Sequence, residues 1–207
     1  MKLTGGVKVS IFVFVLLLID QIVKVIVKTN MTIGESIPVF GTWFEILFVE
    51  NKGMAFGMQF GGDIGKLILT LVRIGLVIFI IRYINKLLRK EDTPVGVIVG
   101  FVLIMCGALG NIVDSLFYGV LFEESTTTHV AQFLGPGGGY APMFMGKVVD
   151  MFYFPIIDMV LPQWVPIWGG ERFQFFQAIF NVADSYITCG GLYLILFKWR
   201  YFAKQQV

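Results

Sequence analysis

The segment VKVSIFVFVLLLIDQIVKVIVK, residues 7–28, is long and apolar enough to cross a membrane as one helix, since a bilayer core needs about 20 such residues. It nevertheless carries Asp20 and Lys24, four positions apart and therefore on one face of a helix. A charge at the bilayer centre costs roughly 2.5–3.5 kcal/mol on insertion scales, so such residues usually face the interior of a bundle. The segment thus predicts a membrane helix with one polar, inward-facing side.

The composition of the whole chain also indicates a membrane protein. Its 207 residues are 57% hydrophobic and only 14% charged, whereas soluble domains carry about 25% charged residues. The net charge of +2 gives no reason to expect a nucleic-acid partner. Cys106 and Cys189 both lie in apolar runs, which favours two buried hydrophobic side chains over a disulfide or a metal site. We expect a single integral membrane domain over residues 1–207.

Four apolar windows predict an all-α bundle of four transmembrane helices. The windows are residues 7–28, about 66–88, about 94–118 and about 178–197. Residues 31–60 are rich in β-branched and aromatic side chains with Gly and Pro breaks, a pattern typical of short strands. We therefore expect small β-rich and loop elements outside the bundle.

The basic residues predict the orientation of the bundle. Basic residues mark three places: the start of the first window (Lys2, Lys8), the junction of the second and third (Arg82, Lys86, Arg89, Lys90) and the end of the fourth (Lys198, Arg200, Lys204). The two long loops, about 29–65 and 119–177, hold only Lys52, Lys147 and Arg172. By the positive-inside rule, both termini and the short middle loop are cytoplasmic. The two long loops and their β-rich elements are then extracytoplasmic.

Two further polar pairs lie inside the predicted helices. Asn111 and Asp114 are three residues apart near the end of the third window, and Asn181 and Asp184 are three residues apart near the start of the fourth. In the predicted orientation, both pairs belong to the outer half of the bilayer, as does the charged pair of the first window. Intramembrane charges usually mark a functional site, although a pair such as Asp20 with Lys24 could also serve only to join helices.

A further carboxylate, Asp150, lies in the segment GKVVDMFYF where the second outer loop returns to the membrane. We expect it to reach the same interfacial pocket as Asp184. Two carboxylates close together in a low-dielectric site cannot both ionise easily, so one keeps a proton near neutral pH. The ionised partner can activate water, and the protonated one can protonate a carbonyl oxygen. This chemistry is suited to the hydrolysis of an amide bond.

Five blocks of the sequence together resemble the bacterial lipoprotein signal peptidases, the signal peptidase II family of four-span aspartyl proteases. The blocks are DQIVK (20–24), VENKGMAFG (49–57), GALGNIVDS (107–115), VVDMF (148–152) and FNVADSYI (180–187). They follow the order of the family along nearly the whole chain. The resemblance implies a membrane aspartyl endopeptidase that removes the signal peptide of prolipoproteins by cleaving before the diacylglyceryl-modified cysteine.

The resemblance also implies roles for individual residues. Position by position, it makes Asp150 and Asp184 the catalytic pair. It assigns substrate binding or support of the pocket to a second set: Asp20, Lys24, Asn51, Gly53, Asn111, Asp114 and Asn181. It implies no metal and no organic cofactor. We expect a monomer in the bacterial inner membrane, surrounded by lipid and acting on diacylglyceryl-modified prolipoproteins at the outer face.

The sequence departs from the family pattern after Asp114. The family usually has an Arg at the next position, where this chain has Ser115. The charge of that Arg is either missing here or supplied by another residue, and Arg73 and Lys147 are the candidates.

A second departure is an insertion in the outer loop, about residues 119–147. Family members place the Val-Val-Asp block only a short step after the third helix. The insertion leaves Asp158, in FPIIDMV, as a rival for the second catalytic position. The flanking residues of Asp150 match the family block on both sides and favour Asp150.

Other functions remain open on the residues alone. A proton-coupled carrier could use Asp20, Asp114 and Asp184 as a relay, and a non-catalytic assembly subunit could use the polar pairs to join helices. However, the third and fourth windows carry no charged residue toward the cytoplasmic side of these pairs, so no path to the cytoplasm is visible. A rhomboid-type serine protease would need a His on a span, whereas His129 lies in a Thr-rich loop and is expected on the surface.

Overall fold

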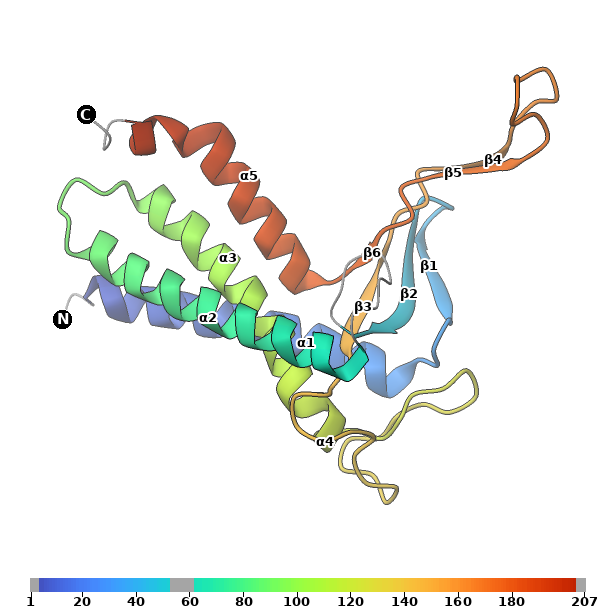
Figure 1. Cartoon of the computed structure of the whole chain (residues 1–207), viewed down its shortest axis with the longest axis horizontal. Coiled ribbons are helices and arrows are strands. Elements are labelled where there is room, and N and C mark those ends of the chain that lie inside the picture. The colour runs from blue at the N-terminus through green and yellow to red at the C-terminus, as the bar shows by residue number, and fades with distance from the viewer. Residues whose placement is uncertain (1–3, 53–61, 204–207) are drawn as a thin grey trace.

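Long helices form one end of the molecule and a small sheet forms the other (Figure 1). The helices are α1 (Gly5–Asn30), α2 (Gly62–Leu88), α3 (Val95–Val113) and α5 (Val182–Ala203). This computed structural model describes residues 4–52 and 62–203. Gly53, one of the predicted site residues, and most of the NKGMAFG block therefore lie outside the described residues.

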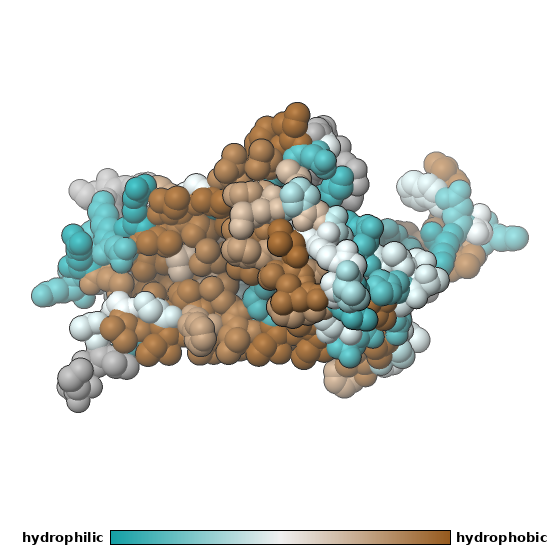
Figure 2. All heavy atoms as spheres, turned by 90° about the horizontal axis from the view of Figure 1, so that it is seen from below, coloured by the Kyte–Doolittle hydropathy of each residue, from teal (hydrophilic) through white to brown (hydrophobic). Residues whose placement is uncertain are grey.

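Three helical stretches are long and apolar enough to cross a membrane: α1, α2 and Val95–Leu121. The last of these continues α3 through a π-helical turn, η2 (Asp114–Tyr118), into the short α4 (Gly119–Leu121). Figure 2 shows an apolar band along the helices, with a hydrophilic end at the termini and a mixed surface over the sheet. An apolar surface of this extent is suited to lipid. The predicted membrane bundle is confirmed for these three stretches.

The fourth helix, α5, begins at Val182, later than the predicted start near residue 178. Ile179 and Phe180 form a short strand, β6, which pairs with Tyr153 and Phe152 of strand β3. Their backbone hydrogen bonds belong to the sheet, so the helix cannot start before this pairing ends. By contrast α2 begins at Gly62, earlier than the predicted residue 66.

The main sheet joins strands from both long loops. Its strands are β1 (Ser36–Phe40), β2 (Phe44–Asn51), β3 (Val148–Tyr153) and β6 (Ile179–Phe180), in the order β1-β2-β3-β6 with every pair antiparallel. The strands expected in residues 31–60 are thus present, and β3 and β6 extend them. Two further strands, β4 (Ile157–Val160) and β5 (Arg172–Phe175), form a separate hairpin that projects away from the bundle (Figure 1).

Two apolar cores lie on either side of the junction between helices and sheet. One fills the space between α1, α2 and α3 and includes Leu16, Val77 and Met105. The other packs the end of α1 and the π-helical turn against the back of the sheet, and it consists of Val27, Met31, Phe48, Tyr118, Phe122, Val149 and Met151. On α1, the buried Asp20 and Lys24 lie between Leu16 of the first core and Val27 of the second.

One prediction for the cysteines is wrong. Cys106 of α3 is buried, as expected, but Cys189 of α5 is exposed. The surface of a membrane helix is apolar whether it contacts lipid or protein, so the apolar sequence around Cys189 did not distinguish the two.

Helices α3 and α5 approach closely because glycines line their interface. A Cβ atom at Gly190 of α5 would lie 2.7 Å from the carbonyl oxygen of Gly100 on α3. At Gly107 of α3, a Cβ atom would meet the carbonyl oxygen of Ala183. Small residues permit this kind of backbone approach in membrane helices. The contact fixes the N-terminal half of α5 against α3.

We expect Gly190→Ala to weaken the contact between α3 and α5, because the new methyl group would press on backbone atoms that cannot move aside. Overpacking of this kind destabilises by about 1–3 kcal/mol. Gly191→Ala is the matched control, since a Cβ atom there would meet nothing within 4 Å. Thermal unfolding of both variants in detergent checks the expectation. Equal unfolding temperatures for the two variants would contradict the close approach.

Candidate active site

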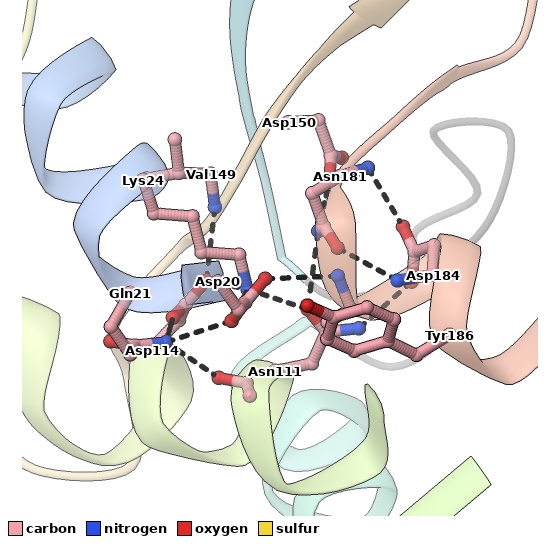
Figure 3. Close-up of polar contacts among 12 residues, drawn as sticks. Asp20, Gln21, Lys24, Asn111, Asp114, Val149, Asp150, Asn181, Asp184 and Tyr186 are labelled. Atoms are coloured by element: carbon pink, nitrogen blue, oxygen red, sulfur yellow. Dashed lines mark hydrogen bonds and ion pairs between the residues drawn. The ribbon is translucent and has the colours of Figure 1, made fainter. Parts of the chain in front are cut away.

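Polar side chains from helices and strands meet where the bundle ends and the sheet begins (Figure 3). They form one connected network of hydrogen bonds and ion pairs. All the predicted site residues within the described part of the chain belong to it: Asp20, Lys24, Asn51, Asn111, Asp114, Asp150, Asn181 and Asp184. Residues from α1, β2, α3, β3 and α5 are thereby brought to one place.

Asp150 lies on β3 and is almost fully buried. Its carboxyl group accepts hydrogen bonds from the side-chain amide of Asn51 on β2 and, at 2.7 Å, from that of Asn181. Burial, followed by the nearby charge of Asp184, raises the pKa of Asp150 from 3.8 to about 8. Asp150 therefore holds a proton near neutral pH.

Asp184 lies in the first turn of α5 and is half-buried. Its carboxylate accepts a hydrogen bond of 2.8 Å from Asn111 Nδ2 and one of 3.4 Å from the backbone N–H of Asn181. Asn181 in turn accepts a hydrogen bond of 2.9 Å from the backbone N–H of Asp184. This reciprocal arrangement is a helix capping box, which explains the spacing of three between Asn181 and Asp184.

Asn181 connects the two carboxyl groups, as Figure 3 shows. Its side-chain amide donates to Asp150, and its backbone N–H donates to Asp184. The same amide also donates to Asn111 Oδ1 at 3.2 Å. Because Asn181 is fully buried and caps α5, its position is fixed, and the positions of both carboxyl groups are fixed with it.

A buried ion cluster lies beneath this pair. Lys24 Nζ is 3.1 Å from Asp20 and 2.9 Å from Asp114, and the side chains of all three residues are fully buried. Lys24 also donates to Asn111 Oδ1 at 3.0 Å. Asp20 accepts a hydrogen bond of 2.9 Å from the backbone N–H of Ala183, one of the groups that the first turn of a helix leaves unpaired. The α1 carboxylate thus anchors the start of α5, where a negative charge is favourable.

Sequence reasoning missed two members of this cluster, Gln21 and Tyr118. Gln21 Nε2 lies 3.0 Å from a carboxylate oxygen of Asp20 and 3.0 Å from one of Asp114, and the Tyr118 hydroxyl donates to Gln21 Oε1 at 3.1 Å. Gln21 stands inside the DQIVK block, so its polar character on an apolar helix was the available signal. No comparable pattern pointed to Tyr118, whose hydroxyl reaches α1 from the π-helical turn η2.

Arg73 and Lys147 are the candidates for the charge that the family usually places after Asp114. Ser115 does not replace it, because its hydroxyl donates to the backbone carbonyl of Asn111 at 2.9 Å. Arg73 of α2, however, lies close enough for its charge to act on Asp184 and, less strongly, on Asp114 and Asp150. Lys147 instead pairs with glutamates. Of the two candidates, Arg73 is therefore the one whose charge acts on the predicted site carboxylates.

The remaining candidates lie elsewhere. Asp158 is on β4, opposite Gln174 in the separate hairpin, so its backbone is not part of the sheet that carries Asp150. His129 is exposed and lies 3.2 Å from Glu123. Within residues 4–52 and 62–203, no group of three or more His, Cys, Asp or Glu side chains is arranged to hold a metal ion. The positive charge between Asp20 and Asp114 comes from the ammonium group of Lys24.

The raised pKa of Asp150 predicts a pH dependence of stability. Between pH 4 and pH 8, the folded protein holds a proton on Asp150 that the unfolded chain releases, so this group lowers the free energy of unfolding as the pH rises. Asp150→Asn removes the effect. We expect the variant to gain up to about 4 kcal/mol over the wild type on going from pH 5 to pH 8.

Thermal unfolding of wild type and Asp150→Asn at the two pH values measures this difference. Asp92→Asn, which alters an exposed carboxylate in the loop between α2 and α3, is the control and should follow the wild type. If the curve of Asp150→Asn ran parallel to that of the wild type, Asp150 would not be titrating in this range.

Comparisons with known proteins identify the family of the chain. The family described as signal peptidase (SPase) II matches residues 12–200. The lipoprotein signal peptidase of Porphyromonas gingivalis (strain W83) is 46% identical over 195 residues, 94% of this chain and 84% of its own. That of Amoebophilus asiaticus is 36% identical over 182 residues, 87% of this chain and 72% of its own.

Two solved structures of bacterial membrane enzymes share the fold. They superpose with TM-scores of 0.60 and 0.61 at 20% and 22% identity, covering 97% and 95% of this chain and 93% and 95% of theirs. None of these comparisons supports a proton-coupled carrier. The chain belongs to the signal peptidase II family, and it is a multi-pass bacterial membrane protein and an endopeptidase of the aspartic type.

Proposed function

We propose that this enzyme removes the signal peptide of prolipoproteins by cleaving before the diacylglyceryl-modified cysteine, with Asp150 and Asp184 as its catalytic pair. The observation that carries the proposal is the pair of carboxyl groups held on either side of Asn181. They differ in environment, because Asp150 is buried and protonated near neutral pH whereas Asp184 is half-buried. Two roles, one acid and one base, need such a difference.

In the proposed mechanism, Asp184 is the general base. Its carboxylate takes a proton from a water molecule as the water oxygen attacks the scissile carbonyl carbon. Asp150 donates its proton to the carbonyl oxygen, so that the tetrahedral intermediate forms without a full negative charge. In the second step, the proton taken by Asp184 passes to the leaving nitrogen, the carbon–nitrogen bond breaks, and Asp150 recovers its proton from the hydroxyl group of the intermediate.

The supporting residues position this pair. Asn111 accepts hydrogen bonds from Lys24 and Asn181 through its oxygen, which turns its amide nitrogen toward Asp184. The buried ion cluster thus fixes the orientation of the amide that holds the base. The positive charge of Arg73 acts most strongly on Asp184 among the three carboxylates, and we assign it the charge that the family usually places after Asp114.

The orientation in the membrane follows from the charge distribution. A surface of Arg82, Asn85, Lys86 and Arg89 lies at the end of α2 that is remote from the sheet, and this basic end fits the cytoplasmic side. We propose that α5 is a fourth span, that both termini are cytoplasmic and that the site opens at the outer face. A lipid-anchored peptide bond would then meet the carboxylates at the depth where water is available. Because one chain supplies both carboxylates, we expect a monomer to be active.

Cleavage of a diacylglyceryl-modified precursor by the purified protein tests the proposal. Asp150→Asn and Asp184→Asn should each lower kcat by about 10²–10⁴-fold, as expected for the loss of an acid or a base, while the protein remains folded. Asp158→Asn is the matched control and should retain activity. Normal cleavage by either of the first two variants would remove that residue from the catalytic pair, and an inactive Asp158→Asn variant with an active Asp150→Asn variant would transfer the role to Asp158.

The pH profile provides a second test. Since Asp150 must donate a proton, we expect the cleavage rate to fall as the pH rises through about 8, the value to which burial raises the pKa of Asp150. The pH at which the rate falls is a property of the coupled pair Asp150 and Asp184, not of one residue alone. Initial rates between pH 5 and pH 10 measure it. A rate that stays constant to pH 10 would exclude protonated Asp150 as the acid.

A further inference from the structure

A second buried ion cluster lies on the opposite face of the sheet from the catalytic pair. Lys28, one turn beyond Lys24 on α1, pairs with Glu50 of β2 at 2.5 Å, and both side chains are almost fully buried. Ser125 joins them, since it accepts a hydrogen bond from Lys28 at 2.9 Å and donates one to Glu50 at 3.3 Å. We call Lys28, Glu50 and Ser125, together with Tyr140 and Lys147, the rear cluster.

The inserted loop completes the rear cluster. Tyr140 lies beneath two ammonium groups, with Lys28 Nζ 5.0 Å and Lys147 Nζ 5.2 Å from the centre of its ring. Lys147 Nζ is also 3.6 Å from the second carboxylate oxygen of Glu50. Ser125, Tyr140 and Lys147 all belong to the insertion between η2 and β3. The insertion therefore supplies three of the five members of the rear cluster.

The rear cluster and the catalytic pair share two strands. Successive side chains of a strand point to opposite faces of the sheet, so Glu50 and Asn51 of β2 point to opposite sides. Glu50 lies opposite Val149 of β3, and Val49 lies opposite Asp150. The side chain of Asn51 is on the site face and hydrogen-bonds Asp150. Fixing Glu50 on the rear face therefore fixes the neighbouring Asn51 on the site face.

A buried ion pair is a poor source of net stability, because the desolvation of both charges opposes their attraction. It is, however, restrictive in geometry, since each charge needs its partner in place. The rear cluster meets this requirement with Ser125, Tyr140 and Lys147, all from one loop. Such an arrangement is better suited to holding β2 in one position than to stabilising the fold.

We infer that Glu50 is a positioning residue of the reaction, and that the inserted loop acts through the Lys28–Glu50 pair to hold Asn51 against Asp150. This inference rests on the proposed catalytic role of Asp150. It gives the insertion a function in catalysis, although none of its residues in the rear cluster lies on the site face of the sheet.

Kinetics of the Glu50→Gln variant test the inference. Gln keeps the shape of the side chain but removes the charge that holds Lys28. We expect kcat for the diacylglyceryl-modified precursor to fall by about 10- to 100-fold, as for a small misplacement of a reacting group, with KM changed by less than about twofold because the residue does not touch the substrate. Glu124→Gln is the matched control. Glu124 is exposed, contacts Lys147 in the same loop, and should be replaceable without effect.

A double variant separates positioning from folding. Glu50→Gln leaves the charge of Lys28 buried without its carboxylate and should lower the unfolding temperature. Lys28→Met combined with Glu50→Met removes both charges and should restore it, because apolar replacements of a buried pair are often neutral or stabilising. We expect kcat of the double variant to remain low. A kcat that recovers together with the unfolding temperature would show a merely structural role and would overturn the inference.

The outcomes for the two proposals are distinct. If the wild type cleaves the precursor and Glu50→Gln is as active as Glu124→Gln, the inference about the rear cluster is wrong and the proposed function stands. If the wild type does not cleave the precursor at all, the proposed function fails and the inference fails with it.

Discussion

The ammonium group of Lys24, buried between two carboxylates, is the interaction on which the rest of the site depends. In an environment of low dielectric constant, an unpaired charge is so unfavourable that each of these groups must find its partners. Asp20 and Asp114 come from different helices, and both contact the same ammonium group. The requirement to pair these charges therefore determines how α1 and the end of α3 lie against each other.

Single hydrogen bonds connect this ion cluster to the proposed catalytic residues. Asp20 accepts a hydrogen bond from the backbone of Ala183 in the first turn of α5. Asn111 accepts a hydrogen bond from Lys24 and donates one to Asp184. The fixed start of α5 then places Asn181, whose backbone and side chain hold one carboxyl group each. In a membrane, apolar contacts do little to distinguish one arrangement of helices from another. Polar contacts of this kind therefore contribute much to determining how the helices are arranged.

Much of this site could be predicted from the sequence because its signals are local. Three of the four hydropathy windows coincide with helices long and apolar enough to cross a membrane, and spacings of three and four residues placed polar pairs on single helix faces. The failures concern contacts between distant segments. The two-residue strand β6 has no recognisable pattern, yet its pairing with β3 delays the start of α5. Lys28 and Glu50 are 22 residues apart on a helix and a strand, no local spacing predicts that they pair, and only the folded chain shows them together behind the sheet.

The antiparallel pairing of Phe152 with Phe180 has a consequence for how this chain can vary in length. This pairing joins the two ends of the segment that leaves β3, forms the β4–β5 hairpin and returns to β6 just before α5. Because the two ends of this segment are joined at the sheet, residues can be added to it or removed from it at little entropic cost. Evolution can thus lengthen or trim the projecting arm between Asp150 and Asp184 without changing how the two carboxyl groups are held by Asn181.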